Sequence, residues 1–144
     1  GDARFVASDA TLNTTFARLG LGAECGITRL LPRLVGLPVA TDLLLTGRTV
    51  TGDEAARLGL ASGTDDPVDS ALTWTGEITT HSSPRSTAMM KRQLLQADGL
   101  TLSDAVTKAL DAMAEAFTWP DLAEALEARA GKRDPQFPDP PGRD

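Results

Sequence analysis

Residues 22–36 read GAECGITRLLPRLVG, and they decide the fold because a glycine-rich turn leads there into an apolar helix. From position 26 onward, apolar side chains recur at helical spacing: Ile27, Leu30, Leu31, Leu34 and Val35. Pro32 lies inside this pattern, so we expect the helix to kink or change pitch there before it ends at Gly36. Glu24 is the only acid of the stretch, which makes it the first residue to consider for proton transfer.

Composition and charge exclude several classes of protein. The chain has 144 residues, the size of one domain, and a net charge of −6. This charge disfavours nucleic-acid binding, which needs a basic face, and binding to an anionic membrane surface. The sequence has no apolar run of about 18 residues that would span a bilayer. Cys25 is the only cysteine, so no intrachain disulfide is possible, and we expect a reducing, cytoplasmic setting.

The chain divides into three regions that differ in residue pattern and in expected secondary structure. Residues 1–66 mix short strand-like segments with glycines, and residues 67–133 read as successive helices. Residues 134–144 carry four prolines and few apolar residues, which predicts an extended or disordered tail.

Local signals predict the elements of the first region. We expect strands at 4–7, 11–16 and 60–62, a helix from Pro38 to Gly47, and a short helix over 55–58. Thr51 and Glu54 fit a capping box, in which the Thr51 hydroxyl accepts a backbone N–H and Glu54 reaches back.

The second region predicts four helices. The first starts at Asp66-Pro67, the second at Ser83-Pro84, and Thr101 caps the third. The third helix is strongly amphipathic, with apolar residues at Leu102, Val106, Leu110, Met113 and Phe117. A last helical face carries Leu122, Leu126 and Ala130.

Several blocks, in order, resemble the enoyl-CoA hydratase/isomerase (crotonase) superfamily. Residues 22–36 resemble the family's glycine-rich turn and its RLPRLVG helix, and DLLLTGR at 42–48 resembles ELLLTGR. The blocks at 53–60, 83–92 and 127–137 resemble AEEALRLGLV, the helix that ends in TKR, and FLEKRKPRF. The similarity covers nearly the whole chain, but only the second half of the family's length.

The resemblance implies an α/β fold, in which part of a crotonase-like ββα spiral (1–66) precedes a C-terminal helical region of the trimerisation type (67–133). The family's first half, which supplies the two N–H groups of the oxyanion hole, is absent from these residues. We therefore expect this chain to be incomplete as an enzyme and inactive alone.

The implied chemistry is that of a lyase or isomerase of fatty acid metabolism, acting on acyl-CoA through an enolate. No metal is implied, and no cofactor apart from the coenzyme A of the substrate. One catalytic glutamate of the hydratases falls at Phe16, which cannot transfer a proton. Glu24 takes the position of a catalytic aspartate in the dienoyl-CoA isomerase branch. We expect it to lie in an apolar pocket, where burial penalises the charged form and favours proton exchange near neutral pH. Alternatively, Glu24 caps the following helix.

The resemblance also suggests substrate-binding residues. Lys91, Arg92 and Lys132 are expected to contact the CoA phosphates, although an ordinary solvated helix face is the simpler explanation for them. Phe117 is expected to line the acyl pocket, unless it belongs to the core or to a subunit interface. His81 is expected in a link between helices. The remaining acids predict an exposed acidic surface without metal-ligand geometry: Asp111, Glu115, Asp121, Glu124 and Glu127.

A second hypothesis is a non-catalytic fragment that assembles through residues 67–133. The family forms trimers or dimers of trimers through these helices, so a homo-oligomer is expected. The apolar faces of residues 1–60 would be left uncovered, which predicts self-association.

Overall fold

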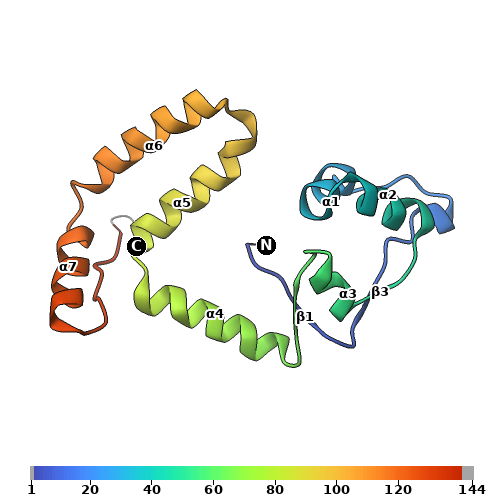
Figure 1. Ribbon diagram of the computed structural model, residues 1–144, viewed down its shortest axis with the longest axis horizontal. Coiled ribbons are helices and arrows are strands. Elements are labelled where there is room, and N and C mark those ends of the chain that lie inside the picture. The colour runs from blue at the N-terminus through green and yellow to red at the C-terminus, as the bar shows by residue number, and fades with distance from the viewer. Residues whose placement is uncertain (1, 141–144) are drawn as a thin grey trace. The chain divides into compact units, whose positions relative to one another are not determined.

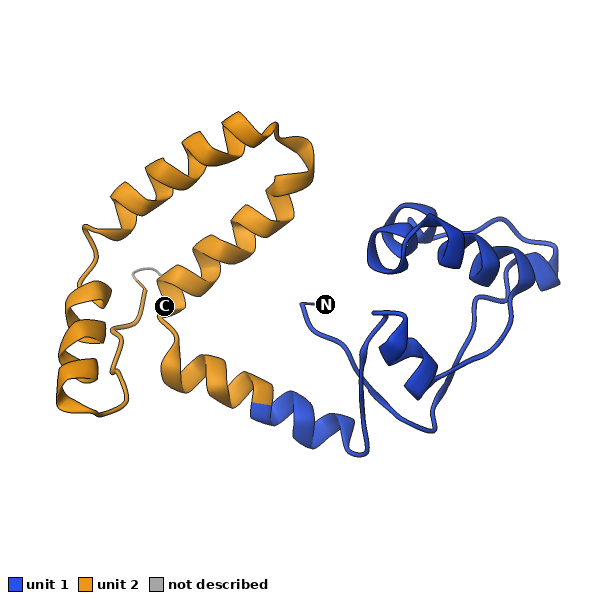
Figure 2. Ribbon diagram, in the orientation of Figure 1, with its two compact units in different colours: residues 1–73 blue, residues 74–144 orange. Residues whose placement is uncertain are grey.

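The computed structural model describes residues 2–140 (Figure 1). The chain forms two compact units, Gly1–Thr73 and Trp74–Asp144 (Figure 2). The first combines short strands with helices and the second is helical, which confirms the expected α/β class with a helical C-terminal part.

Four short strands form two small sheets within residues 2–73: β1 (Phe5–Ala7), β2 (Thr11–Leu12), β3 (Val50–Thr51) and β4 (Ser62–Thr64). β1 and β4 are parallel, whereas β2 and β3 are antiparallel. The expected strand over 11–16 is shorter because the chain turns into a 3-10 helix, η1 (Ala17–Leu19). β4 starts two residues later than expected because the Leu60 N–H donates to the Ala55 carbonyl and still belongs to the preceding turn.

The helices of this unit are α1 (Ile27–Val35), α2 (Leu37–Thr46) and α3 (Gly52–Arg57). Pro32 lies within α1, which continues past it to Val35, and the Pro32 carbonyl accepts the N–H of Gly36. α2 ends, as predicted, at Gly47, which adopts a left-handed φ of 56°. One buried core joins these helices to β3: Leu31, Ala40, Leu43, Val50 and Ala55.

Polar contacts tie α2 to α3. The Thr51 hydroxyl accepts the Glu54 N–H at 3.2 Å, so the cap is confirmed. The Glu54 carboxylate does not complete the predicted box, because it accepts from Arg48 Nη1 at 2.8 Å. Arg48 Nε also donates to Asp42 at 2.6 Å, and these two hydrogen bonds raise the pKa of Arg48. Gly52 packs so closely on β1 that a Cβ atom there would lie 1.9 Å from the Ala7 carbonyl oxygen.

The remaining helices are α4 (Pro67–His81), α5 (Pro84–Gln96), the 3-10 helix η2 (Ala97–Gly99), α6 (Leu102–Ala116) and α7 (Asp121–Gly131). The hydroxyls of Ser83 and Thr101 accept backbone N–H groups at the starts of α5 and α6, which confirms the predicted helix start at Ser83-Pro84 and the predicted cap at Thr101. α5 and α6 form an antiparallel hairpin (Figure 1). The apolar side chains of α6 are exposed in this chain: Leu102, Val106, Leu110, Met113 and Phe117.

The tail has no helix or strand over residues 134–140, and residues 141–144 lie outside the described part. The described segment is held by specific contacts. The Gln136 N–H donates to Glu124 at 2.6 Å, and Arg85 donates to the carbonyls of Pro138 and Asp139.

Candidate functional site

Glu24 lies in the loop between η1 and α1. Two consecutive left-handed residues shape this loop, Cys25 with φ 54° and Gly26 with φ 69°, and the Glu24 carbonyl accepts the Ile27 N–H at 3.1 Å. The side chain is exposed, so its expected burial in an apolar pocket is wrong for this chain. Residues 20–26 of the loop are all exposed, among them Leu21.

The capping alternative for Glu24 has no hydrogen bond to support it. Gly26 occupies the N-cap position of α1. Among residues 2–140 the Glu24 carboxylate has no recorded hydrogen bond or ion pair. Its carboxylate is therefore available to an incoming group.

Exposed leucines are frequent on this loop and on the neighbouring elements η1, α1 and α2: Leu19, Leu21, Leu30, Leu34, Leu37 and Leu45. Phe16 stands at the start of η1 and is half-buried. Two residues earlier, the Thr14 hydroxyl donates to the Leu43 carbonyl at 2.6 Å and lines a hollow of about 190 Å³. Sequence reasoning missed this hollow, because its walls come from distant segments such as Leu12, Ile27 and Leu60.

The predicted phosphate-binding residues occupy different places in the second unit. Arg92 lines a polar hollow of about 330 Å³, together with Lys108, Asp111 and Glu115. Lys91 is exposed on α5. Lys132, also exposed, ends α7 in a left-handed conformation with φ 50° and does not line the Arg92 hollow.

Phe117 lines a separate hollow of about 400 Å³. Aromatic and aliphatic side chains form most of its wall: Met90, Met113, Phe117, Trp119, Leu122, Ala125 and Phe137. The polar part of the lining comes from Ser82, Ser83, Ser86 and Asp121. An apolar hollow with a few convergent polar groups is the usual character of a small-molecule site.

Asp121 is buried, so its expected place on an acidic surface is wrong. It is 4% exposed, and its carboxylate accepts from the Ser83 hydroxyl at 2.5 Å and from Arg85 Nη1 at 2.6 Å. Burial of a carboxylate is tolerated here because both oxygens are paired. The sequence signal for this cluster is weak: an arginine and an aspartate in the first turns of two helices.

Glu124, another acid of that predicted surface, is also paired, and two acids outside it lie beside His81. The hydrogen bond from Arg133, followed by that from the Gln136 N–H, lowers the pKa of Glu124 to about 2. His81 is the last residue of α4 rather than part of a link, and its two ring nitrogens lie 3.3 Å from carboxylate oxygens of Glu77 and Asp134.

Within the described residues, no three His, Cys, Asp or Glu side chains gather as metal ligands. No described helix is both long enough and apolar enough to cross a bilayer.

Comparison with known proteins gives consistent matches. The family model described as enoyl-CoA hydratase/isomerase matches residues 1–140. The peroxisomal Delta(3,5)-Delta(2,4)-dienoyl-CoA isomerase of Arabidopsis thaliana is 32% identical over 94% of this chain and 50% of its own length. A probable enoyl-CoA hydratase of Mycobacterium tuberculosis is also 32% identical, over 94% of this chain and 54% of its own.

Solved structures agree with these matches. A probable enoyl-CoA hydratase/isomerase from Mycobacterium abscessus superimposes with a TM-score of 0.92 at 28% identity, over 97% of this chain and 58% of that protein. The chain thus spans about half the length of the curated relatives it matches.

Proposed function

The chain belongs to the enoyl-CoA hydratase/isomerase family, and from that premise we propose that it carries the proton-transferring carboxylate of an acyl-CoA site, Glu24. The observation that supports this role is the setting of that side chain. Glu24 stands on a loop with two left-handed residues, at the head of α1, and its carboxylate has no recorded partner among the described residues. An A. thaliana relative named as a dienoyl-CoA isomerase matches across this region.

In the proposed reaction, the Glu24 carboxylate removes a proton from a carbon conjugated to the thioester carbonyl. The electron pair of the broken C–H bond moves into an enolate, and the protonated carboxyl then returns its proton to another carbon of the acyl chain. The net result is a shift of the double bond. Hydration would begin differently: a water molecule adds to the β-carbon of the enoyl thioester while its proton passes to a carboxylate, and the enolate that results is protonated at the α-carbon. The half-buried Phe16 takes no part in proton transfer, which favours isomerisation over the two-glutamate hydration mechanism.

The enolate oxygen needs two preorganised N–H donors, and we place these outside the 144 residues of this chain. The chain spans about half the length of its relatives, and the exposed leucines around the Glu24 loop form an apolar surface suited to a covering segment. Exclusion of water by that segment would strengthen every electrostatic contact of the carboxylate.

The substrate-binding part of the proposal rests on the second unit. Arg92, with Lys91 on the same helix and Lys132 at the end of α7, would bind the CoA phosphates. Phe117 would contact the acyl group, because it lines an apolar hollow of about 400 Å³. No cofactor beyond the substrate's own coenzyme A is needed for proton transfer.

The test compares Glu24→Gln with Glu127→Gln, a matched change at an exposed acid of α7. Double-bond isomerisation and crotonyl-CoA hydration are measured together with acyl-CoA affinity by calorimetry, in the native polypeptide that contains these residues. We expect Glu24→Gln to lower turnover by about 10²–10⁴-fold with little change in affinity. Equal turnover in both variants would remove Glu24 from the mechanism.

A second candidate function is assembly without catalysis, and the exposed apolar stripe of α6 favours it. Such a stripe on a helix that sits at the surface is typical of an interface. Sedimentation of this chain and of Leu110→Glu tests the idea. A concentration-dependent oligomer, of which the trimer is our expectation, should dissociate in the variant, whereas a monomer in both would exclude self-assembly through α6.

A further inference from the structure

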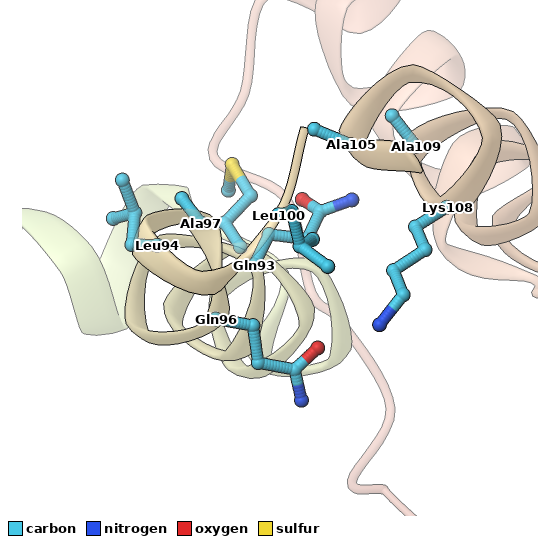
Figure 3. A pocket seen from close by; sticks show the side chains of 9 residues that line it. Gln93, Leu94, Gln96, Ala97, Leu100, Ala105, Lys108 and Ala109 are labelled. Atoms are coloured by element: carbon cyan, nitrogen blue, oxygen red, sulfur yellow. The ribbon is translucent and has the colours of Figure 1, made fainter. Parts of the chain in front are cut away.

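The hairpin of α5 and α6 borders a hollow of about 400 Å³ that is distinct from the one lined by Phe117 (Figure 3). This volume lies within the range of about 300–1,000 Å³ that is typical of small-molecule sites. Its apolar wall comes from both helices and from the turn between them: Met90, Leu94, Ala97, Leu100, Ala105 and Ala109. On the α6 side the apolar lining consists of the methyl groups of Ala105 and Ala109, which leave room for an extended chain.

Polar groups stand at one side of this apolar wall. Lys108 lies between Ala105 and Ala109 on α6, and Gln93 and Gln96 lie on α5. In Figure 3 the side chains of Lys108 and Gln96 reach into the space between the two helices. The same three polar residues also line the neighbouring hollow of about 330 Å³, so they mark the junction between an apolar and a polar space.

The Lys108 ammonium has no carboxylate within ion-pair distance among residues 2–140. The polar hollow beyond it contains Arg92 as a second cation and two acids, Asp111 and Glu115. These acids would repel an anion that went further in. A negatively charged head group is therefore favoured at Lys108, at the edge of the apolar wall.

We propose that this junction binds a straight-chain carboxylate, with its alkyl chain along the α5–α6 hollow and its carboxylate at Lys108. The carboxylate would accept charge-assisted hydrogen bonds from Lys108 Nζ and a further one from the Gln96 amide, contacts of the stronger class. Each buried methylene would tighten binding about fourfold. The proposal does not depend on the role of Glu24, and it survives if that role is refuted.

The first test separates the two halves of the ligand by calorimetry with octanoate, decanoate and 1-decanol as probes. Decanoate should bind about 15-fold more tightly than octanoate if both extra methylenes are buried. Decanoate should also bind more tightly than 1-decanol. Lys108→Gln should abolish this preference for the carboxylate and keep the dependence on chain length. Arg129→Gln, which removes one positive charge from exposed α7, should change neither.

The second test locates the ligand with ¹³C-methyl-labelled methionine. Met90 lines both the α5–α6 hollow and the Phe117 hollow, whereas Met113 lines only the Phe117 hollow, so the Met113 signal distinguishes the two. Decanoate should shift the Met90 methyl signal and leave that of Met113 in place. Ala109→Phe adds a ring at an exposed helix position and should fill the hollow, which abolishes binding without loss of helical circular dichroism.

Three results would overturn the proposal. One is the absence of decanoate binding, and another is a carboxylate preference that survives Lys108→Gln. The third is a shift of Met113 together with unchanged affinity in folded Ala109→Phe, which would place the ligand elsewhere.

Discussion

Replacement of Asp121 by Asn should destabilise the second unit, because this side chain joins three segments. Its carboxylate accepts hydrogen bonds from the Ser83 hydroxyl at the start of α5 and from Arg85, two residues further on. Arg85 also holds the tail through the Pro138 and Asp139 carbonyls. Asn keeps the shape of the side chain and removes its charge. A hydrogen bond to a charged group contributes about 1.5–3 kcal/mol, so we expect a loss of about 2 kcal/mol.

Asp121→Ala removes both contacts and leaves the guanidinium of Arg85 partly unpaired. Breaking a buried ion pair costs about 3–5 kcal/mol, and we expect the lower end, about 3 kcal/mol. The reason is that the Arg85 side chain is 15% exposed and keeps two carbonyl partners.

The assay is urea unfolding followed by the fluorescence of Trp119, which lines the same hollow as Asp121. A Trp74→Phe background removes the signal of the only other tryptophan. With a slope of about 1–2 kcal/mol per molar, a loss of 2 kcal/mol lowers the midpoint by about 1–2 M. Asp111→Asn, at an exposed position of α6, is the matched control and should stay within about 0.5 kcal/mol of the parent.

A double-mutant cycle with Ser83→Ala tests whether the two residues act together. Ser83 also accepts the Ser86 N–H, so its replacement alone loses a helix cap, worth about 1 kcal/mol. Because the Ser83 hydroxyl donates directly to Asp121, the two changes should be non-additive by at least about 0.5 kcal/mol. Additive effects, or an Asp121→Asn midpoint equal to that of Asp111→Asn, would refute the reasoning.

Three further predictions concern other contacts. The pKa of Glu124 is lowered to about 2 by Arg133, so its contribution to stability should be complete above about pH 4.5 and be lost as the pH falls through 2. Glu124→Gln should therefore reduce the pH dependence of the unfolding free energy between about pH 4.5 and 2. Gly52→Ala would force a Cβ atom against the β1 carbonyl and should lower the melting temperature sharply, whereas Gly76→Ala, in open space on α4, should stabilise by up to about 1 kcal/mol. Thr101→Ala should cost about 1 kcal/mol, seen as faster amide exchange in the first turn of α6, and Thr101→Ser should restore protection.

Two sequence expectations about burial were wrong for the same reason. Glu24 lies in an apolar stretch and matches the position of a catalytic aspartate in the family, which predicts an apolar pocket, but its side chain is exposed. Asp121 was expected to be exposed because acids surround it in the sequence, but it is 4% exposed. Sequence neighbours do not decide burial, because the atoms that cover a side chain come from other segments.

The residues that line the hollows could not be predicted from the sequence either. Gln93 and Lys108 both border the α5–α6 hollow, although they belong to different helices. Their spacing in the sequence does not predict that they lie close together. The motif blocks did predict the family, since the family model matches residues 1–140. The roles of Glu24, Lys91, Arg92, Phe117 and Lys132 remain predictions.

The sequence by itself determined the starts of α5 and α6, the end of α2, and the family to which the chain belongs. Ser83, Thr101 and Gly47 act on backbone groups within a few residues, so their effects can be read locally. Only the tertiary structure decided which charges are paired and which apolar faces stay open. Arg85 donates to Asp121, which lies 36 positions further along the chain, and the apolar stripe of α6 is exposed in the described part of the chain. Burial and ion pairing depend on contacts between residues far apart in the sequence, so only the tertiary structure decides them.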